Sequence, residues 1–262
     1  MITLLSPAKK LNFDARETAL ETTRPRLEDD TRAIAQVAKA QSAADLKRLM
    51  HISDKLAELN AERFSAFDLD GRSNSAKPAG LTFDGDVYWG LEAKSMDDAA
   101  LAYAQDHLRI LSGLYGLLRP MDAIQPYRLE MGTKMANPRG KSLYDFWGSR
   151  IGEKLADDLN GHGDNTIVNL ASNEYFKAVD TDVLPGKVIE ASFLNVKDGE
   201  ARRLMYHVKF ARGLMARWIM ENRIEKADDL RGFDAEGYRY DASASNENEL
   251  VFTRKQPPVK KK

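Results

Sequence analysis

One segment constrains the fold more than any other, because it forces two neighbouring strands to run in opposite directions. Residues 187–207, KVIEASFLNVKDGEARRLMYH, contain two strand-like runs on either side of Asp198-Gly199. An Asp-Gly pair between such runs is a strong hairpin signal, because both central positions of a type I′ turn need a positive φ. A hairpin contains an antiparallel pair, so the sheet that holds it is not wholly parallel.

Short apolar runs predict the rest of this sheet. ITLLS at residues 2–6 and NTIVNLAS at residues 165–172 have the continuous apolar character of buried strands and are too short for helices. HLRILSGLYG, residues 107–116, is a third such run, and LTFDGDVYWGL, residues 81–91, is interpreted as strand and turn. Segments with helical periodicity alternate with these runs, at residues 28–67, 97–106, 142–159 and 208–223. We therefore predict an α/β protein with a mixed sheet and surrounding helices.

Length and composition predict a single large domain. The chain has 262 residues, of which 43% are hydrophobic and 30% charged, as in ordinary soluble proteins. We expect one domain at residues 1–254 and a basic flexible tail at residues 255–262, which acts either as a solubilising end or as a binding arm. No apolar run approaches the roughly 18 residues that span a bilayer, so we expect a cytoplasmic protein without a membrane partner.

Charge and residue usage exclude several kinds of chemistry. The chain has no cysteine, which excludes disulfides, thiolate catalysis and thiolate metal sites. Its four histidines lack the spacing of metal ligands, and the phosphate-binding glycine motifs and the GxSxG motif are missing, so no metal and no cofactor is predicted. Because the formal net charge is −1, any binding of nucleic acid has to come from local clustering of cations.

One such cluster follows the third strand. GLYGLLRPMDAIQPYRLEMG, residues 113–132, combines turn-forming residues with arginine and tyrosine, which suit an anion that carries a ring, such as a nucleotide or nucleic acid. NPRGKS, residues 137–142, adds cations just before a helix that Ser142 is placed to cap. The predicted cleft residues in these segments are Arg119, Tyr127, Arg128, Arg139 and Lys141.

Glu130 lies among these cations and is the weak candidate for a catalytic residue. A carboxylate in such a place can act as a general base or can orient an arginine. An ion-pair role is the more common one. The sequence therefore does not identify a catalytic residue, and a role other than an enzyme is favoured.

Two strand ends and one helix edge extend the predicted cleft. Ser6 and either Ser172 or Asn173 are placed to cap helices directly after buried strands, with Lys9 just beyond the first of them. On the helix near residues 208–223, Lys209 and Arg212 fall together beyond the apolar arc, with Gly213 and Ala216 on the same side. These small residues allow close approach of another backbone or of a ligand. Ordinary capping and a solvated helix face are the alternatives.

A second type of nucleic-acid element is suggested by LKRLMHISDKLAELNAERF, residues 46–64. It resembles a helix-hairpin-helix, in which backbone N–H groups of a tight hairpin hold a phosphate. The candidate contacts are Lys47, Arg48, Ser53 and Lys55. The two glycines of the motif are replaced by His51 and Ser53, so a simple helical hairpin that packs on the core is the alternative.

Taken together, these segments resemble the YaaA family of bacterial peroxide-stress resistance proteins. The matching stretches run from the first strand almost to ELVFTR: SPAKKL, MHISDKLAELNAERF, FDGDVYWGL, LRILSGLYGLLRPMDAIQPYRLEMG, GKSLYDFWG, NLASNEYFKAV, ARGLMARWIMENRI and GFDAEGYRYD. The resemblance implies an unusual α/β fold with a helix-hairpin-helix near residues 44–67 and a positively charged cleft that binds DNA. It also implies a role in limiting peroxide damage by keeping unincorporated iron low.

Three readings of function follow, of which direct sequestration of iron is the least favoured. The first is a DNA-binding protein of the peroxide-stress response, with duplex, damaged or structured DNA as its partner. The second is an enzyme that acts on a nucleotide, a nucleobase or a damaged base in the same pocket, which then holds a small anionic ligand.

Overall fold

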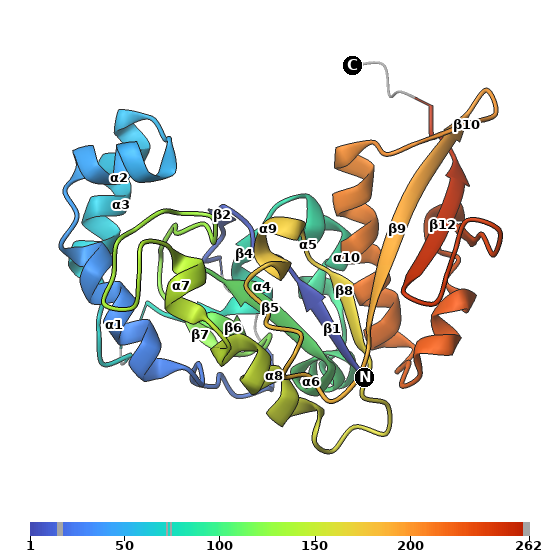
Figure 1. The fold of residues 1–262 in the computed structure, drawn as a ribbon, viewed down its shortest axis with the longest axis horizontal. Helices are drawn as coiled ribbons and strands as arrows, with labels where there is room; N and C mark the ends of the chain where they lie inside the picture. Colours follow the sequence, from blue (N-terminus) through green and yellow to red (C-terminus); the bar gives the residue numbers. More distant parts are fainter. Residues whose placement is uncertain (15–17, 72, 74, 259–262) are drawn as a thin grey trace.

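An eight-stranded mixed sheet forms the centre of the molecule. The computed structural model describes residues 1–14, 18–71, 73 and 75–258. The strand order is β11-β12-β9-β8-β1-β5-β6, with β10 paired to β9 (Figure 1). The strands are β1 (Ile2–Leu5), β5 (Leu108–Ser112), β6 (Gly116–Leu118), β8 (Ile167–Leu170), β9 (Val188–Lys197), β10 (Glu200–Arg202), β11 (Arg239–Tyr240) and β12 (Glu249–Lys255). The predicted mixed α/β class is confirmed.

The three central strands run parallel and are buried along their whole length. β1 lies between β8 and β5, with Leu5 opposite Leu170 and Ile110. Every residue of these three strands is buried, which explains why their sequences are runs rather than alternations. Because the strands are parallel and in register, the residues that follow Leu5, Ser112 and Leu170 meet at one edge of the sheet, the carboxyl edge.

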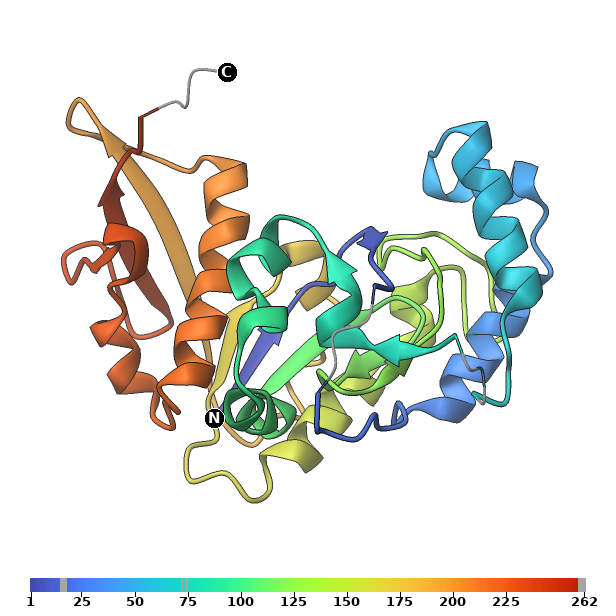
Figure 2. The same cartoon turned by 180° about the vertical axis from the view of Figure 1, so that it is seen from behind.

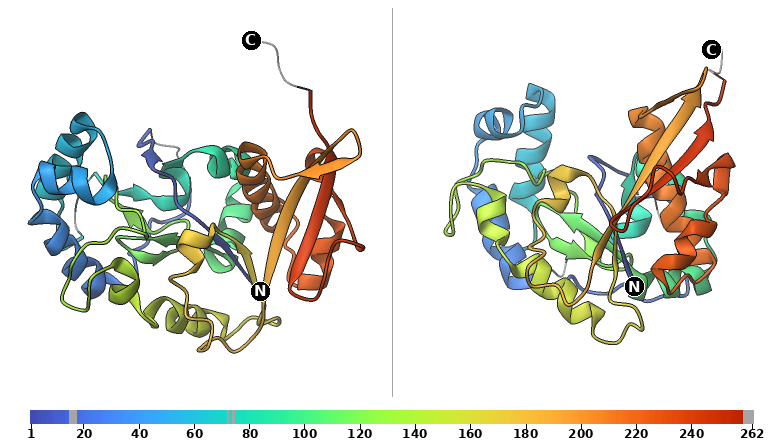
Figure 3. Two further views of the ribbon diagram at one scale, coloured as in Figure 1. Left: turned by 45° about the horizontal axis from the view of Figure 1, so that its top comes forward. Right: turned by 45° about the vertical axis from the view of Figure 1, so that its right-hand side comes forward.

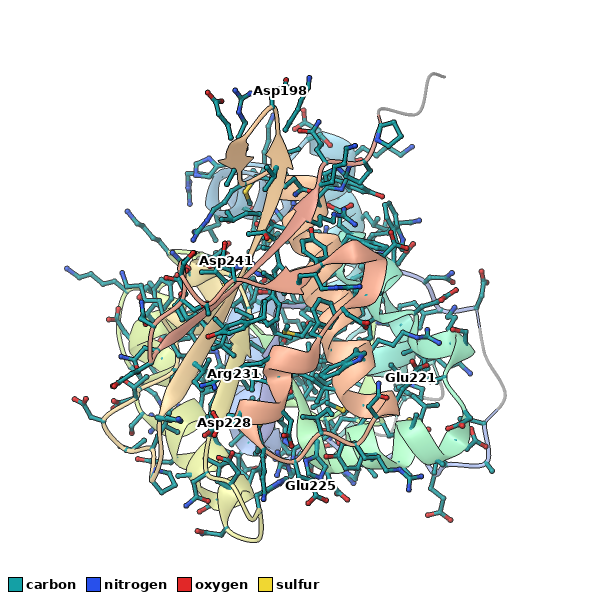
Figure 4. All side chains as sticks on the ribbon, turned by 90° about the vertical axis from the view of Figure 1, so that its right-hand side faces the viewer. Asp198, Glu221, Glu225, Asp228, Arg231 and Asp241 are labelled. Atoms are coloured by element: carbon teal, nitrogen blue, oxygen red, sulfur yellow. The ribbon has the colours of Figure 1, made fainter. Side chains whose placement is uncertain are left out.

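The predicted hairpin is present. β9 and β10 pair antiparallel about Asp198 and Gly199, which have φ values of 54° and 81°. Asp198 lies at the tip of this hairpin, away from the body of the sheet (Figure 4). β12 joins β9 in parallel, and Gln256 N donates to the Val196 carbonyl. The strand thus includes Lys255, the first residue of the predicted tail, and residues 259–262 of that tail lie outside the described residues.

Helices cover both faces of the sheet, with α8 on one side and α6 on the other (Figures 1 and 2). The helices are α1 (Glu28–Lys39), α2 (Ala43–Met50), α3 (Asp54–Ala66), α4 (Ala79–Thr82), α5 (Asp86–Leu91), α6 (Asp98–His107), α7 (Leu143–Trp147), α8 (Arg150–Leu159), α9 (Asn173–Phe176) and α10 (Met205–Glu221), with 3-10 helices η1 (Ala93–Ser95), η2 (Ala227–Gly232) and η3 (Ala235–Gly237). Two further pairs of short strands are β2 (Lys10–Leu11) with β4 (Phe83–Asp84), and β3 (Lys77–Pro78) with β7 (Ala123–Ile124).

Several predicted boundaries change. The helical pattern at 28–67 is three helices, and the one at 142–159 is two, separated at Gly148 with φ 50°. Ser142 caps α7 through a capping box with Asp145, as its position predicts. The interpretation of residues 81–91 as strand and turn is wrong, because this segment is mostly helix and contains only the two-residue β4. The aromatic side chains that suggested a strand pack there against each other, with the Phe83 and Tyr88 rings 5.2 Å apart.

Two parts of the chain project beyond the carboxyl edge. α2 and α3 form one projection, and the β9–β10 hairpin with the amino-terminal half of α10 forms the other (Figures 1 and 3). The carboxyl ends of β1 and β8, with α9, lie between them. Some of the residues predicted to bind an anion therefore lie on the two projections, and others lie at the strand ends between them.

Close packing of α10 on α5 depends on two glycines. A Cβ on Gly213 would lie 1.7 Å from the Val87 carbonyl oxygen, and one on Gly90 would lie 2.1 Å from the Phe210 carbonyl oxygen. The small residue in α10 thus admits another backbone, one of the two options that the sequence left open. The helix crossing offsets the roughly 1 kcal/mol that an interior glycine costs.

Gly213→Ala should therefore destabilise the protein, although alanine is the better helix former. We expect the free energy of unfolding to fall by about 1–3 kcal/mol, because the two backbones have to separate. Chemical denaturation measures it. Gly163→Ala is the matched control, since a Cβ there has no atom within 4 Å, and it should change stability by less than about 0.5 kcal/mol. Equal effects in the two variants would contradict the packing argument.

Candidate functional site

The carboxyl edge brings Ser6 and Ser172 together. Ser172 N donates to Ser6 Oγ at 2.8 Å, and the two hydroxyls are 3.3 Å apart. Ser172 stands at the N-cap of α9, ahead of the exposed Asn173, but its side chain does not cap the helix. Ser6 starts no helix, contrary to the prediction, because the chain from Pro7 to Lys9 is irregular and leads into the short strand β2. The two hydroxyls thus join neighbouring strand ends across 166 residues of sequence.

A cluster of three charges lies beside these serines. Glu130 Oε2 is 2.7 Å from Lys9 Nζ, and Glu130 Oε1 is 2.7 Å from an Arg128 nitrogen. Burial alone would raise the pKa of Glu130, but the hydrogen bonds and charges of Lys9 and Arg128 outweigh it and hold the pKa below its usual range. Both carboxylate oxygens are occupied, so the geometry fits an ion-pair partner better than a general base. The three groups together keep one net positive charge.

Buried tyrosines surround this cluster. The Tyr127 hydroxyl lies 2.7 Å from Ser112 Oγ, and the Tyr88 hydroxyl donates to the Ser6 carbonyl at 3.0 Å. Tyr175, on α9, is buried nearby, and burial raises the pKa of all three phenols. They are therefore neutral hydroxyls near pH 7. They provide hydrogen-bonding groups in an apolar wall and no nucleophilic phenolate.

Sequence reasoning found Tyr127 but missed Ser112, Tyr88 and Tyr175. A signal for Ser112 exists, because each of three buried strands is followed within two residues by a serine or ends in one: LLS, RILS and NLAS. Tyr88 was hidden by the wrong interpretation of residues 81–91. Its role depends on α5 crossing over the end of β1, which no local pattern reveals.

We refer to Ser6, Lys9, Tyr127, Arg128, Glu130 and Ser172, which lie around the ends of β1, β5 and β8, as the carboxyl-edge cluster. Two more predicted residues lie across α5 from it, on α10. Lys209 Nζ is 3.7 Å from Asp86 on α5, and Arg212 follows one turn later. Burial lowers the pKa of Arg212. The structure thus adds α10 to the boundary of this region.

Three predicted cleft residues form no hydrogen bond or ion pair with the carboxyl-edge cluster among the described residues. Arg119 follows β6, which runs antiparallel to β5, so it lies at the opposite edge of the sheet, where it pairs with Asp122 at 2.8 Å. Arg139 pairs with Asp30 of α1 at 2.6 Å and stacks on the Phe146 ring. Lys141 is exposed, and its backbone N–H donates to Asp145 in the cap of α7. Proximity in sequence to Arg128 therefore did not place Arg119 near it in space.

The predicted hairpin element consists of α2, α3 and a three-residue connection. His51 adopts the left-handed conformation, with φ 52° and ψ 47°, at one of the positions where the sequence lacks the glycine of the motif. Ser53 caps α3 and accepts a hydrogen bond from Leu56 N at 3.4 Å. The turn is therefore achieved without glycine.

Two of the four cations on this arm form ion pairs with its carboxylates. Lys47 Nζ lies 2.7 Å from Asp54, and Arg48 lies 2.7 Å from Asp45. Lys55 is exposed and forms no ion pair within the described part of the chain. Of the four predicted DNA contacts, Lys55 is the cation that is open to a phosphate.

Histidines gather at the opposite, amino edge of the sheet. The rings of His107 and His162 are 4.6 Å apart and line a cavity of about 420 Å³ with Arg109 and Asp158. Burial, and then the nearby positive amino terminus, lowers the pKa of His162 to about 4, so this ring is neutral at pH 7. Among the described residues, no group of three or more His, Asp or Glu side chains could hold a metal ion.

Comparison with known proteins decides the family. The model of the family described as peroxide stress protein YaaA matches residues 1–244. This chain belongs to that family. A UPF0246 protein of Phenylobacterium zucineum is 51% identical over 98% of this chain and 96% of its own length. UPF0246 proteins of Caulobacter vibrioides and Maricaulis maris are 51% and 52% identical, again over 98% of this chain and over 100% and 97% of their own lengths.

The family supports a role in peroxide stress, as the sequence predicts. Among the described residues, no helix is long and apolar enough to cross a membrane.

Proposed function

We propose that this protein binds DNA as part of the peroxide-stress response, with the α2–α3 arm as its primary contact. The observation that carries the proposal is the connection between the two helices. His51 takes a left-handed turn and Ser53 caps α3 at Leu56 N, while the backbone N–H groups of Asp54 and of the unpaired Lys55 form no hydrogen bond within the described residues. Free N–H groups at a helix start and a nearby cation suit a phosphate.

The arm carries little net charge, and this limits what kind of binding to expect. Its four cations are matched by four carboxylates, Asp45, Asp54, Glu58 and Glu62. Non-specific attraction by a basic surface is therefore weak, and binding relies on a few placed contacts. The carboxyl-edge cluster, with its one net positive charge, and the cations of α10 supply a second contact region between the two projections.

Salt dependence of DNA affinity tests the proposal. We expect wild-type protein to bind a short fluorescent duplex with an affinity that falls as salt rises, at a log-log slope of roughly −0.9 for each neutralised phosphate. Lys55→Glu should weaken binding about tenfold near 0.1 M salt and make the slope shallower by about one. Fluorescence anisotropy at several salt concentrations measures both.

Lys226→Glu is the matched control, because it makes the same charge change at an exposed residue. Lys226 precedes η2 at the amino edge, away from the arm, and forms no ion pair within the described residues. Its affinity should stay within about twofold of wild type. If the two variants weaken binding equally, net charge rather than the arm explains it; if wild type shows no salt-sensitive binding, the proposal fails.

Protection of iron balance is the cellular part of the proposal. We infer that the protein keeps unincorporated iron low through its action on DNA, because the described residues offer no metal site of their own. Cells that lack the gene should then regain peroxide resistance with the wild-type protein and the Lys226→Glu variant. They should not regain it with Lys55→Glu.

An enzyme that acts on a nucleotide or a damaged base is the second candidate. The observation in its favour is that three serines and three buried tyrosines converge at the carboxyl edge. A phosphate contact alone does not need so many hydroxyl groups. Substrates of open α/β sheets bind at this edge. Glu130 remains the weak candidate for a catalytic residue in this case.

A further inference from the structure

We propose that Arg212 binds an oxyanion, a phosphate or a carboxylate, at the seam between α10, α5 and the part of β9 that carries Glu190. This site is separate from the α2–α3 arm, and the inference does not depend on DNA binding. The inference rests on the Arg212 guanidinium, which has no hydrogen-bond or ion-pair partner among the described residues.

Arg212 differs from the other cations around the carboxyl edge. Lys9 and Arg128 contact Glu130, and Lys209 faces Asp86. Across the described residues, the Arg212 guanidinium forms no hydrogen bond and no ion pair, and its Nε atom is buried away from solvent. Buried polar groups are nearly always paired, so an open N–H donor of this kind calls for a partner.

The helix geometry places Arg212 at the edge of the buried face. Val208, Ala211 and Met215 are buried, and Gly213 contacts the α5 backbone. At 100° per residue, position 212 falls between these two contact faces of α10, and not on its solvent side. Since α10 runs opposite to the parallel strands, its amino-terminal half lies at their carboxyl edge (Figure 1).

Two charged groups of opposite sign act on the pKa of Arg212. After burial, the groups that affect its pKa are Glu190 of β9, which raises it, and Arg203, which lowers it. Arg203 is itself paired with Glu249 at 3.2 Å. Among the described residues, Glu190 forms no ion pair with Arg212, and its Oε1 accepts a hydrogen bond from Asn169 Nδ2 at 3.5 Å.

Guanidinium chemistry selects the ligand class. Its planar donors match two oxygens of a phosphate or carboxylate at once, which a lysine does not do. Two sources can supply such a group, a backbone phosphate of DNA or a free small molecule. The two sources are separated by experiment.

The Arg Nε–H resonances in ¹H–¹⁵N NMR spectra give a direct test. The Arg212 resonance is assigned by its loss in Arg212→Lys. Titration with inorganic phosphate at constant ionic strength, set with chloride, should shift it to saturation, while the resonance of Arg139, which pairs with Asp30, stays in place. Arg212→Lys, which keeps the charge, should bind phosphate at least tenfold more weakly by calorimetry.

The outcomes separate the alternatives. A shift with phosphate and with acetate supports a general oxyanion site, and a shift with phosphate alone supports a phosphate site. A shift with duplex DNA but not with either free anion assigns the site to a backbone phosphate. If no anion moves the resonance and Glu190→Gln does, then Glu190 is the partner of Arg212 and the proposal is overturned; no shift under any of these conditions overturns it as well.

Discussion

Asp158→Asn is expected to lower the free energy of unfolding by about 3–5 kcal/mol, the largest effect on stability that we predict. Asp158, on α8, accepts hydrogen bonds from Arg109 of β5 at 2.6 Å and from Arg26 before α1. The side chains of Asp158 and Arg109 are each only 5% exposed. Loss of the carboxylate leaves two largely buried cations without a counter-charge, which costs more than the pair itself contributes. Urea denaturation followed by circular dichroism measures the change.

Asp157→Asn is the control for this variant. Asp157 is the neighbouring residue on the same helix, but its side chain is 67% exposed and pairs only with Lys154. We expect a change below about 0.5 kcal/mol. A loss of similar size in both variants would show that the effect does not come from the buried ion pair and would contradict the prediction.

The same carboxylate predicts part of the acid limb of stability. Burial alone would raise the pKa of Asp158, but Arg26 and Arg109 outweigh it and lower the pKa below its usual value. The unfolded chain therefore takes up this proton first as pH falls. The contribution of Asp158 is complete above a pH of about 4 and is lost as the pH falls through the lower pKa of the folded protein. In Asp158→Asn this part of the pH dependence should be missing.

Glu130→Gln is expected to raise the affinity for DNA about five- to tenfold near 0.1 M salt and to steepen the salt slope by about 0.9. The carboxylate now neutralises one of the two cations at its sides, Lys9 and Arg128. Its replacement by an amide frees one more positive charge, equivalent to about one additional phosphate contact. Fluorescence anisotropy with the same duplex and salt series measures both quantities.

This variant also separates the two candidate functions. If the carboxyl-edge cluster is a catalytic pocket in which Glu130 moves a proton, turnover of the substrate should be lost, and any rise in affinity is incidental. If the cluster only binds DNA, affinity rises without loss of cellular protection. Glu28→Gln is the matched control, because Glu28 also pairs with an arginine, Arg24, but lies on α1. Unchanged or weaker DNA binding in Glu130→Gln would exclude the cluster from the DNA contact.

Local features of this chain were readable because they act over a few residues. The Asp198-Gly199 turn follows from two positive φ values, and the cap at Ser142 follows from a carboxylate three residues later. Strands such as β1 are apolar along their whole length because both faces are covered. The prediction for residues 81–91 was wrong because a short aromatic run fits a strand and a helix equally well. Only tertiary packing selects one of the two.

The sequence by itself therefore determined the mixed α/β class, the three central strands, the β9–β10 hairpin and a short set of polar residues at strand ends. Only the tertiary structure decided which of these residues meet. Ser6 contacts Ser172 because β1 and β8 are parallel and in register. Arg119 lies at the opposite edge of the sheet because β6 is antiparallel to β5. Pairing of charges was likewise settled by distances between remote segments, which local patterns do not encode. For that reason the sequence does not distinguish one cation from another. Only the tertiary structure shows that Glu130 pairs with Lys9 and Arg128, while Arg212 forms no ion pair among the described residues.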